Sequence, residues 1–218
     1  MIAVLALSLV VTAQAHATTM LYANVERLTE ISTLVVEGEV VGQRTWQVDE
    51  GGIFTEWTLS VSEVLKGDAS TTVRFRQWGG QIGDVSTYIP GDARFEVGER
   101  VMVFLHNDDE GVFWPSALGQ SKFVIGSGPG PVGPEVPLEE AVERGMDLDP
   151  TRMRRIDIPR LDGMELPELA SRDLRSLSFY DDRRAGEPVY HIHRVEVMRH
   201  AELVERVREA VRLEQPAR

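Results

Sequence analysis

Apolar and polar residues alternate through most of the first half of the chain. In residues 53–62, larger apolar residues and one threonine take every second position, and runs of similar character occupy residues 34–41, 72–78, 112–114 and 122–125. Strict alternation predicts strands with one buried and one solvated face, so Glu37 and Glu39 are expected on a wet face. Residues 100–105 are apolar on both faces, which is typical of a central strand. Short strands separated by turns predict an all-β barrel or sandwich.

Two segments show helical periodicity instead. Residues 18–33 place apolar side chains at spacings of three and four, which predicts a short helix leading into the sheet. Residues 200–213 carry a continuous apolar stripe that includes Leu203, Val204 and Val207, and they give the strongest helix signal in the chain. We expect this stripe to cover the open side of the barrel. Weaker patterns predict helices at 138–144 and 166–177 and a strand at 189–197.

A tract rich in glycine and proline divides the chain. Residues 127–134 contain too many of these residues for a helix or a central strand. The predicted organisation is a signal peptide at 1–17, a β-barrel domain at 18–126, a linker at 127–134, and a polar extension at 135–218 that ends in the helix at 200–213.

The signal peptide is predicted from the first residues. Residues 2–12 form an apolar and small run that is too short to span a bilayer, and Ala13, Ala15 and Ala17 supply small-x-small cleavage sites. No lysine or arginine precedes the run, which departs from the usual pattern. We expect an exported protein, periplasmic or extracellular, with no membrane attachment after the signal is removed.

Composition narrows the classes of function. The net charge is −12 and the pI is about 4.9, so nucleic acid and anionic membranes are poor partners. The chain has no cysteine, which excludes disulfides, thiol nucleophiles and cysteine-based metal sites. The fold must therefore be held by core packing alone.

The order of the predicted elements resembles that of the netrin-like module, the OB-type barrel that also occurs in tissue inhibitors of metalloproteinases. Three segments carry the resemblance: Leu34–Val40, Val61–Gly67 and Phe95–Phe104. The resemblance covers about residues 18–125 and implies a mainly β fold. That fold is a closed barrel with a short N-terminal helix and a C-terminal extension. Uncharacterised exported bacterial proteins show similar elements. The inhibitors bind the target's zinc through an N-terminal cysteine, which this chain lacks, so no functional residue is carried over.

Tryptophans supply the candidate binding residues. The four tryptophans of the chain could line a groove for a sugar or a peptide, although Trp57 lies on the predicted buried face. Trp78, followed by Gly79 and Gly80, is the best candidate for an exposed contact. We expect a protein partner to bind through the loops at residues 45–52 and 79–91.

Two histidines could hold a metal. His191 and His193 are two residues apart, so on a strand they would share one face. Surface imidazoles on a half-exposed strand are the alternative explanation. The sequence thus favours an exported, non-catalytic binding or structural protein without a cofactor. The alternatives are a metal-dependent hydrolase with a His191 and His193 site, or a secreted protease inhibitor.

Overall fold

The fold was analysed in a computed structural model. It describes residues 19–48, 52–126, 167–175, 177–180, 190–191 and 195–214. The predicted signal peptide, the linker at 127–134 and the possible helix at 138–144 lie outside these residues. None of the helices in the described ranges is long and apolar enough to cross a membrane.

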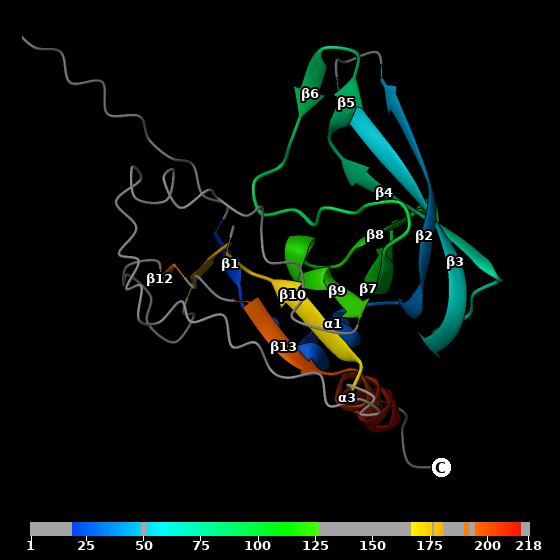
Figure 1. The fold of residues 1–218 in the computed structure, drawn as a ribbon, viewed down its shortest axis with the longest axis vertical. Helices are drawn as coiled ribbons and strands as arrows, with labels where there is room; N and C mark the ends of the chain where they lie inside the picture. The colour runs from blue at the N-terminus through cyan, green and yellow to red at the C-terminus, as the bar shows by residue number, and fades with distance from the viewer. Residues whose placement is uncertain are drawn as a thin grey trace, which may run out of the picture.

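A closed ring of five strands is the centre of the fold (Figure 1). The strands follow one another around the ring in the order β2, β3, β4, β8 and β7, and β7 pairs again with β2. All neighbours are antiparallel except β4 and β8, which are parallel and meet only at Phe75 and Phe113. The ring strands are β2 (Leu34–Gln47), β3 (Ile53–Lys66), β4 (Thr72–Trp78), β7 (Arg100–Asn107) and β8 (Phe113–Pro115).

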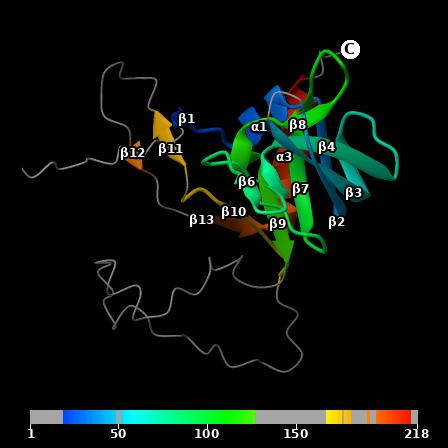
Figure 2. The ribbon, with the colours of Figure 1, turned by 90° about the horizontal axis from the view of Figure 1, so that it is seen from above.

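Three further strands extend the sheet beyond β7, in the order β9, β10 and β13 (Figure 2). Two of them come from the C-terminal part of the chain and pair antiparallel with each other. A 3-10 helix, η1, precedes β9, and helix α3 follows β13 without a break. The bounds are η1 (Leu118–Ser121), β9 (Lys122–Gly126), β10 (Leu169–Asp173), β13 (Val195–Arg199) and α3 (His200–Glu214).

The remaining elements lie around this sheet. Helix α1 packs beside α3 at one end of the ring, and the β5–β6 hairpin stands at the opposite end (Figure 1). A small separate sheet joins β1, β11 and β12. The bounds are β1 (Thr19–Leu21), α1 (Val25–Ile31), β5 (Gly80–Ile82), β6 (Val85–Thr87), β11 (Ser178–Tyr180) and β12 (Tyr190–His191).

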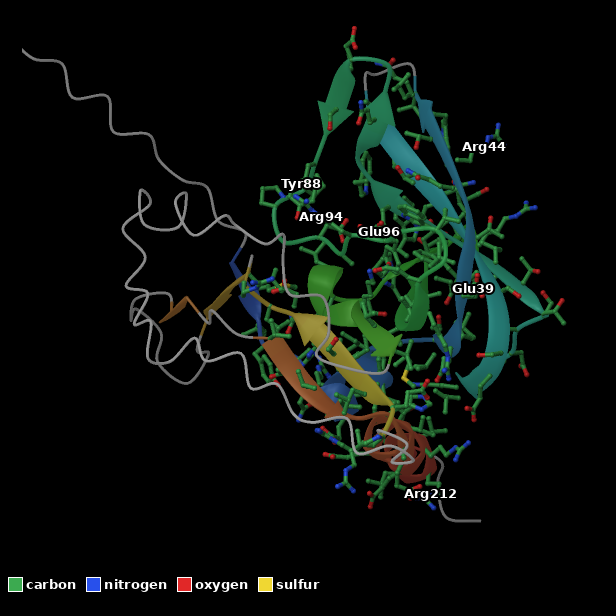
Figure 3. All side chains as sticks on the ribbon, viewed as in Figure 1. Glu39, Arg44, Tyr88, Arg94, Glu96 and Arg212 are labelled. Carbon is green, nitrogen blue, oxygen red and sulfur yellow. The ribbon has the colours of Figure 1, made fainter. Side chains whose placement is uncertain are left out.

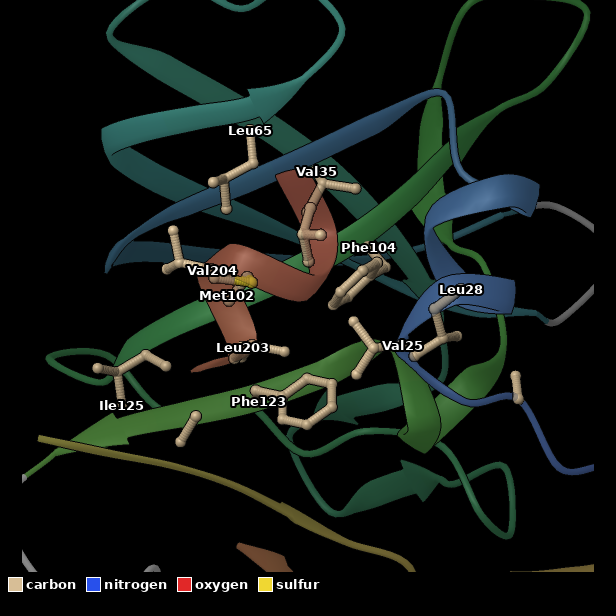
Figure 4. Packing of buried hydrophobic residues seen from close by; sticks show 13 residues of the cluster. Val25, Leu28, Val35, Leu65, Met102, Phe104, Phe123, Ile125, Leu203 and Val204 are labelled. Carbon is tan, nitrogen blue, oxygen red and sulfur yellow. The ribbon is translucent and has the colours of Figure 1, made fainter. Parts of the chain in front are cut away.

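The sheet buries apolar residues on both of its faces. Inside the ring, Val36, Leu59, Phe75 and other aliphatic or aromatic side chains form one cluster. Outside the ring, α1 and α3 cover a second cluster that includes Phe104 and Leu203 (Figure 4). The chain has no cysteine, so these two clusters hold the fold together without disulfides.

The structure confirms several predicted elements and corrects others. The strands predicted at 72–78 and 122–125 and the helix at 200–213 are present within one residue of the expected bounds. The helix predicted at 18–33 is shorter in the structure, where only α1 is helical. It begins after Asn24 because the Asn24 side chain accepts a hydrogen bond from the Arg27 N–H and caps the helix there. The helix predicted at 166–177 is wrong, since Leu169–Asp173 in its centre form β10, which pairs with β9 and β13.

Glu37 is the main residue whose burial differs from the prediction for its strand. Alternation places it on a wet face, but only 2% of the residue is exposed, while Glu39 is exposed as predicted. The helices and the added strands cover the outer face of this half of β2, which the local pattern does not encode. Trp57, predicted in the core, is buried.

Candidate functional site

Four aromatic rings gather on the outer surface of the ring, at the end where β2 and β3 form a hairpin. Trp46, Phe54 and Trp78 are direct cross-strand neighbours on β2, β3 and β4. The Phe54 ring lies 6.0 Å from Trp46 and 4.1 Å from Trp78, and Trp114 of β8 lies 6.2 Å from Trp78. Trp78 is 56% exposed. We call these four residues the aromatic face.

A row of charged residues runs beside the aromatic face. Arg44, Glu56 and Arg76 are cross-strand neighbours one step further along the same outer surface, and Arg74 follows on β4. Arg44 projects from β2 toward solvent (Figure 3). The guanidinium carbons of Arg44 and Arg76 lie 6.0 and 5.3 Å from the Trp46 ring. We call Arg44, Glu56, Arg76 and Arg74 the arginine row, which is positive on a chain whose net charge is −12.

The charge of the arginine row is only partly neutralised. Glu56 lies 3.6 Å from Arg76 Nε, which is beyond hydrogen-bonding distance. Arg76 Nε is buried and has no hydrogen-bond partner among the described residues. With three guanidinium groups and one carboxylate, the arginine row suits contact with an additional anionic group.

Trp114 is fixed by a carboxylate. Asp108 Oδ2 accepts a hydrogen bond of 2.8 Å from the Trp114 indole N–H, and Oδ1 accepts from the backbone N–H groups of Glu110 and Val112. These hydrogen bonds lower the pKa of Asp108 from its ordinary value of 3.8. The hydrogen bond from the Trp114 indole has the largest effect on this pKa, and the one from the Val112 N–H is next. The turn between β7 and β8 therefore holds one edge of the aromatic face in place.

The two predicted glycines, Gly79 and Gly80, allow the sharp turn that follows Trp78. Gly79 and Gly80 have φ angles of +93° and +138°, which side chains rarely adopt. A Cβ on Gly79 would lie 2.6 Å from the Thr87 carbonyl oxygen, and one on Gly80 would lie 2.3 Å from Thr55 Oγ1. These glycines therefore turn the chain from β4 into β5, and this turn positions Trp78.

The structure brings together three of the four tryptophans named from the sequence and separates the fourth. Trp46, Trp78 and Trp114 join the aromatic face, while the Trp57 indole N–H donates to the buried Gln77 side chain, 2.7 Å away. Sequence reasoning missed Phe54 and the arginine row. The signal was present, because Phe54 and Glu56 alternate out of phase with the buried residues of β3.

A second polar cluster lies at the opposite end of β2, where Glu37 meets Arg100, Glu168 and His200. Arg100 Nε donates to Glu37 Oε1 over 2.8 Å, and Arg100 also pairs with Glu168. The two nitrogens of His200 lie 2.5 Å from Glu37 Oε2 and 3.0 Å from Glu168 Oε2. Arg100 and His200 thus each contact both carboxylates, and these contacts fix the first residue of α3 to the sheet.

The predicted metal ligands remain untested. The backbone of His191 belongs to β12, its side chain is not described, and His193 lies outside the described residues. Within the ranges that the structure covers, no group of three or more histidine, aspartate or glutamate side chains is arranged to hold a metal ion.

Comparisons with protein-family models, with curated proteins and with solved structures found no match to this chain. The site is therefore interpreted from its own residues. Exposed rings offer flat apolar surfaces and guanidinium groups offer donors, so the aromatic face and the arginine row are equipped to bind.

Proposed function

We propose that this chain is an exported, non-catalytic binding protein that contacts its ligand through the aromatic face and the arginine row. The single observation that carries the proposal is the half-exposed Trp78, which packs against Phe54 and Trp114 beside the arginine row. Large aromatic residues are normally buried, and exposed clusters of them mark binding surfaces. Tryptophan and arginine are also the residues that contribute most often to binding hot spots.

An OB-type barrel, as in the netrin-like module, is the fold that we propose for the ring. The order β7, β2, β3, β4 is that of a Greek key, and β8 closes the ring as a fifth strand. OB-type barrels contact ligands through the face of their second and third strands and through the loops after strands one and four. In this chain those positions correspond to β3 and β4, the hairpin between β2 and β3, and the turn before Trp114.

Export is part of the proposal and depends on the apolar run at residues 2–12 with its small-residue cleavage sites. The absence of cysteine is compatible with an oxidising compartment because no thiol can mispair there. Fractionation of the producing cell, with detection of the mature chain outside the cytoplasm, tests this part separately.

Site-specific photo-crosslinking tests the binding function. A photo-reactive aromatic amino acid, which keeps a ring at the position, replaces Trp78 in one version of the exported protein. The same amino acid replaces Leu213, which is 80% exposed on α3, in the matched control. We expect a discrete crosslinked species from position 78 that is absent from position 213. Equal adducts at both positions, or none at either, would contradict the proposal.

A second variant separates binding from folding. Trp78→Ala should remove the partner from a capture experiment that uses the whole protein as bait. It should lower the free energy of unfolding by no more than about 1 kcal/mol, because the side chain is half exposed. Retained capture with the alanine variant would show that the aromatic face is not the contact.

A further inference from the structure

The half of β2 that carries Trp46 has an unpaired edge. Strand β7 pairs with residues 34–39 of β2, and Val40 still bonds to Glu99 and Gly98. A register shift follows between Val40 and Gly42. Beyond it, the backbone of residues 42–47 pairs only with β3 in the part of the chain that the structure describes.

The hydrogen-bonding phase shows which backbone groups face this edge. The Val48 N–H donates to the Gly52 carbonyl over 2.9 Å, so Val48 points toward β3. In an antiparallel sheet, hydrogen-bonded and non-hydrogen-bonded residue pairs alternate along the strand. The backbone N–H and C=O groups of Trp46 and Arg44, two and four residues before Val48, therefore also face β3. The N–H and C=O groups of Gln43, Thr45 and Gln47 therefore point away from β3, along the free edge.

The side chains of the edge set the chemistry of a strand that pairs with it. On the outer surface, Trp46 and Arg44 end the two cross-strand rows, and both rows stop at this edge. An added strand would place one side chain beside Trp46 and another, two residues away, beside Arg44. Those positions suit an apolar residue and an acidic residue, respectively.

We propose that the free edge of β2 at residues 43–47 takes up an extended acidic segment of another protein as an additional strand. This proposal rests on the proposed function and names its partner. The bound segment would continue the aromatic face with an apolar side chain and the arginine row with a carboxylate. Its backbone would satisfy the N–H and C=O groups of Gln43, Thr45 and Gln47.

Charge and backbone chemistry favour a peptide over other anionic chains. The edge presents donors and acceptors in alternation, and a peptide backbone matches both, whereas a glycan or a nucleic acid has no row of N–H donors at strand spacing. A dense polyanion is also repelled by the net charge of −12. A segment with only a few carboxylates is repelled less by the net charge of the chain, and it can still pair with the arginine row.

A synthetic peptide provides the probe. The sequence Thr-Val-Thr-Glu-Thr-Val-Thr, with blocked ends, places valine two residues from glutamate in either chain direction. Added to the whole isotope-labelled protein, it should slow amide hydrogen exchange at Gln43, Thr45 and Gln47 by about tenfold or more at saturation. It should leave the amides of Arg44 and Trp46 unchanged, because these already bond to β3.

Two altered peptides identify the interaction. Replacing glutamate by lysine should weaken binding by about fivefold or more, because Arg44 then faces a like charge. Methylating the amide nitrogens that face β2 should abolish binding while it keeps every side chain. Equal binding of the methylated peptide would overturn strand addition without any change to the protein.

Matched variants of the protein locate the contact. Arg44→Glu should weaken the acidic peptide by about fivefold or more and favour the lysine peptide, while Arg212→Glu at the far end of the molecule should change neither (Figure 3). Gln43→Pro removes one outward N–H, and Gln43→Ala is its control, so loss of binding in the proline variant alone supports edge pairing. A fully unfolded proline variant leaves the methylated peptide as the deciding result.

Other outcomes would reject the peptide and still leave the binding function intact. An oligogalacturonate that protects the aromatic face from modification, where the peptide does not, would indicate a glycan. Concentration-dependent dimers that lose this edge protection on dilution would indicate a second copy of the chain. If crosslinks form at position 78 but no peptide slows exchange at the edge, strand addition is wrong and the proposed function stands.

Discussion

The two halves of strand β2 are continuous in sequence but have very different surroundings. In the first half, residues 34–38 are buried on both faces, one against the interior of the ring and the other against the helices. In the second half, residues 41–47 are exposed or half-exposed and carry Arg44 and Trp46 outward. One half therefore forms part of the core, and the other half lies at the surface of the ring.

Segments distant in sequence determine whether a side chain of β2 is covered or exposed. Glu37 is covered because Arg100 and His200 arrive from β7 and α3, more than sixty residues away. No described element arrives over Trp46, which meets only its neighbours on the sheet and two arginines. Substitutions in the covered half and near the exposed half test this contrast.

The largest loss of stability is expected from a substitution in the apolar cluster that α3 covers. Leu203 is fully buried, so Leu203→Ala should lower the free energy of unfolding by about 2–5 kcal/mol through lost burial and a residual cavity. Leu213→Ala, on the exposed side of the same helix, should change it by less than about 0.5 kcal/mol. Denaturant unfolding measures both, and similar small losses would show that α3 does not seal the outer cluster.

A smaller effect is expected at Glu37. Glu37→Gln leaves Arg100 and His200 facing a neutral amide, which should cost about 1–3 kcal/mol of unfolding free energy. Glu39→Gln, two residues along on the exposed side, is the control and should be nearly neutral. If both variants lose the same amount, the buried cluster contributes no more than a surface charge.

The smallest effect on stability is expected at Asp108, which holds Trp114 in the aromatic face. The pKa of Asp108 is lowered in the folded protein, so its contribution to stability is present above about pH 3.8 and is lost as the pH falls through the folded value. Tryptophan fluorescence should therefore change in this acidic range as Trp114 is released. Asp108→Asn should flatten the transition, whereas Asp84→Asn, in the exposed turn between β5 and β6, should retain it.

Much of the fold could be predicted because its strands bury one face in a regular alternation. The run at 53–62 and the apolar stripe of α3 specify their own structures through local periodicity. Leu169–Asp173 were predicted as part of a helix because the local pattern does not encode their partners. They form β10 by pairing with β9 and β13, and β9 is more than forty residues away in sequence.

The candidate site was predicted only in part. Trp78 stands out because two glycines follow a strand and mark a sharp turn. Its partners Phe54 and Trp114 are distant in sequence, and only the register between β3 and β4 and the closure by β8 bring them together. Register and closure depend on the whole sheet, so local patterns could not supply the rest of the aromatic face.

The narrow join between β4 and β8 has a consequence for motion. These strands meet at one register pair, whereas β2 and β3 pair along nearly their full length, so breathing of the ring should begin at the join. Trp78 and Trp114 stand on its two sides with their centroids 6.2 Å apart. A ligand that contacts both indoles would bind only while the ring is closed. The fraction of molecules with a closed ring would therefore rise with the ligand's occupancy.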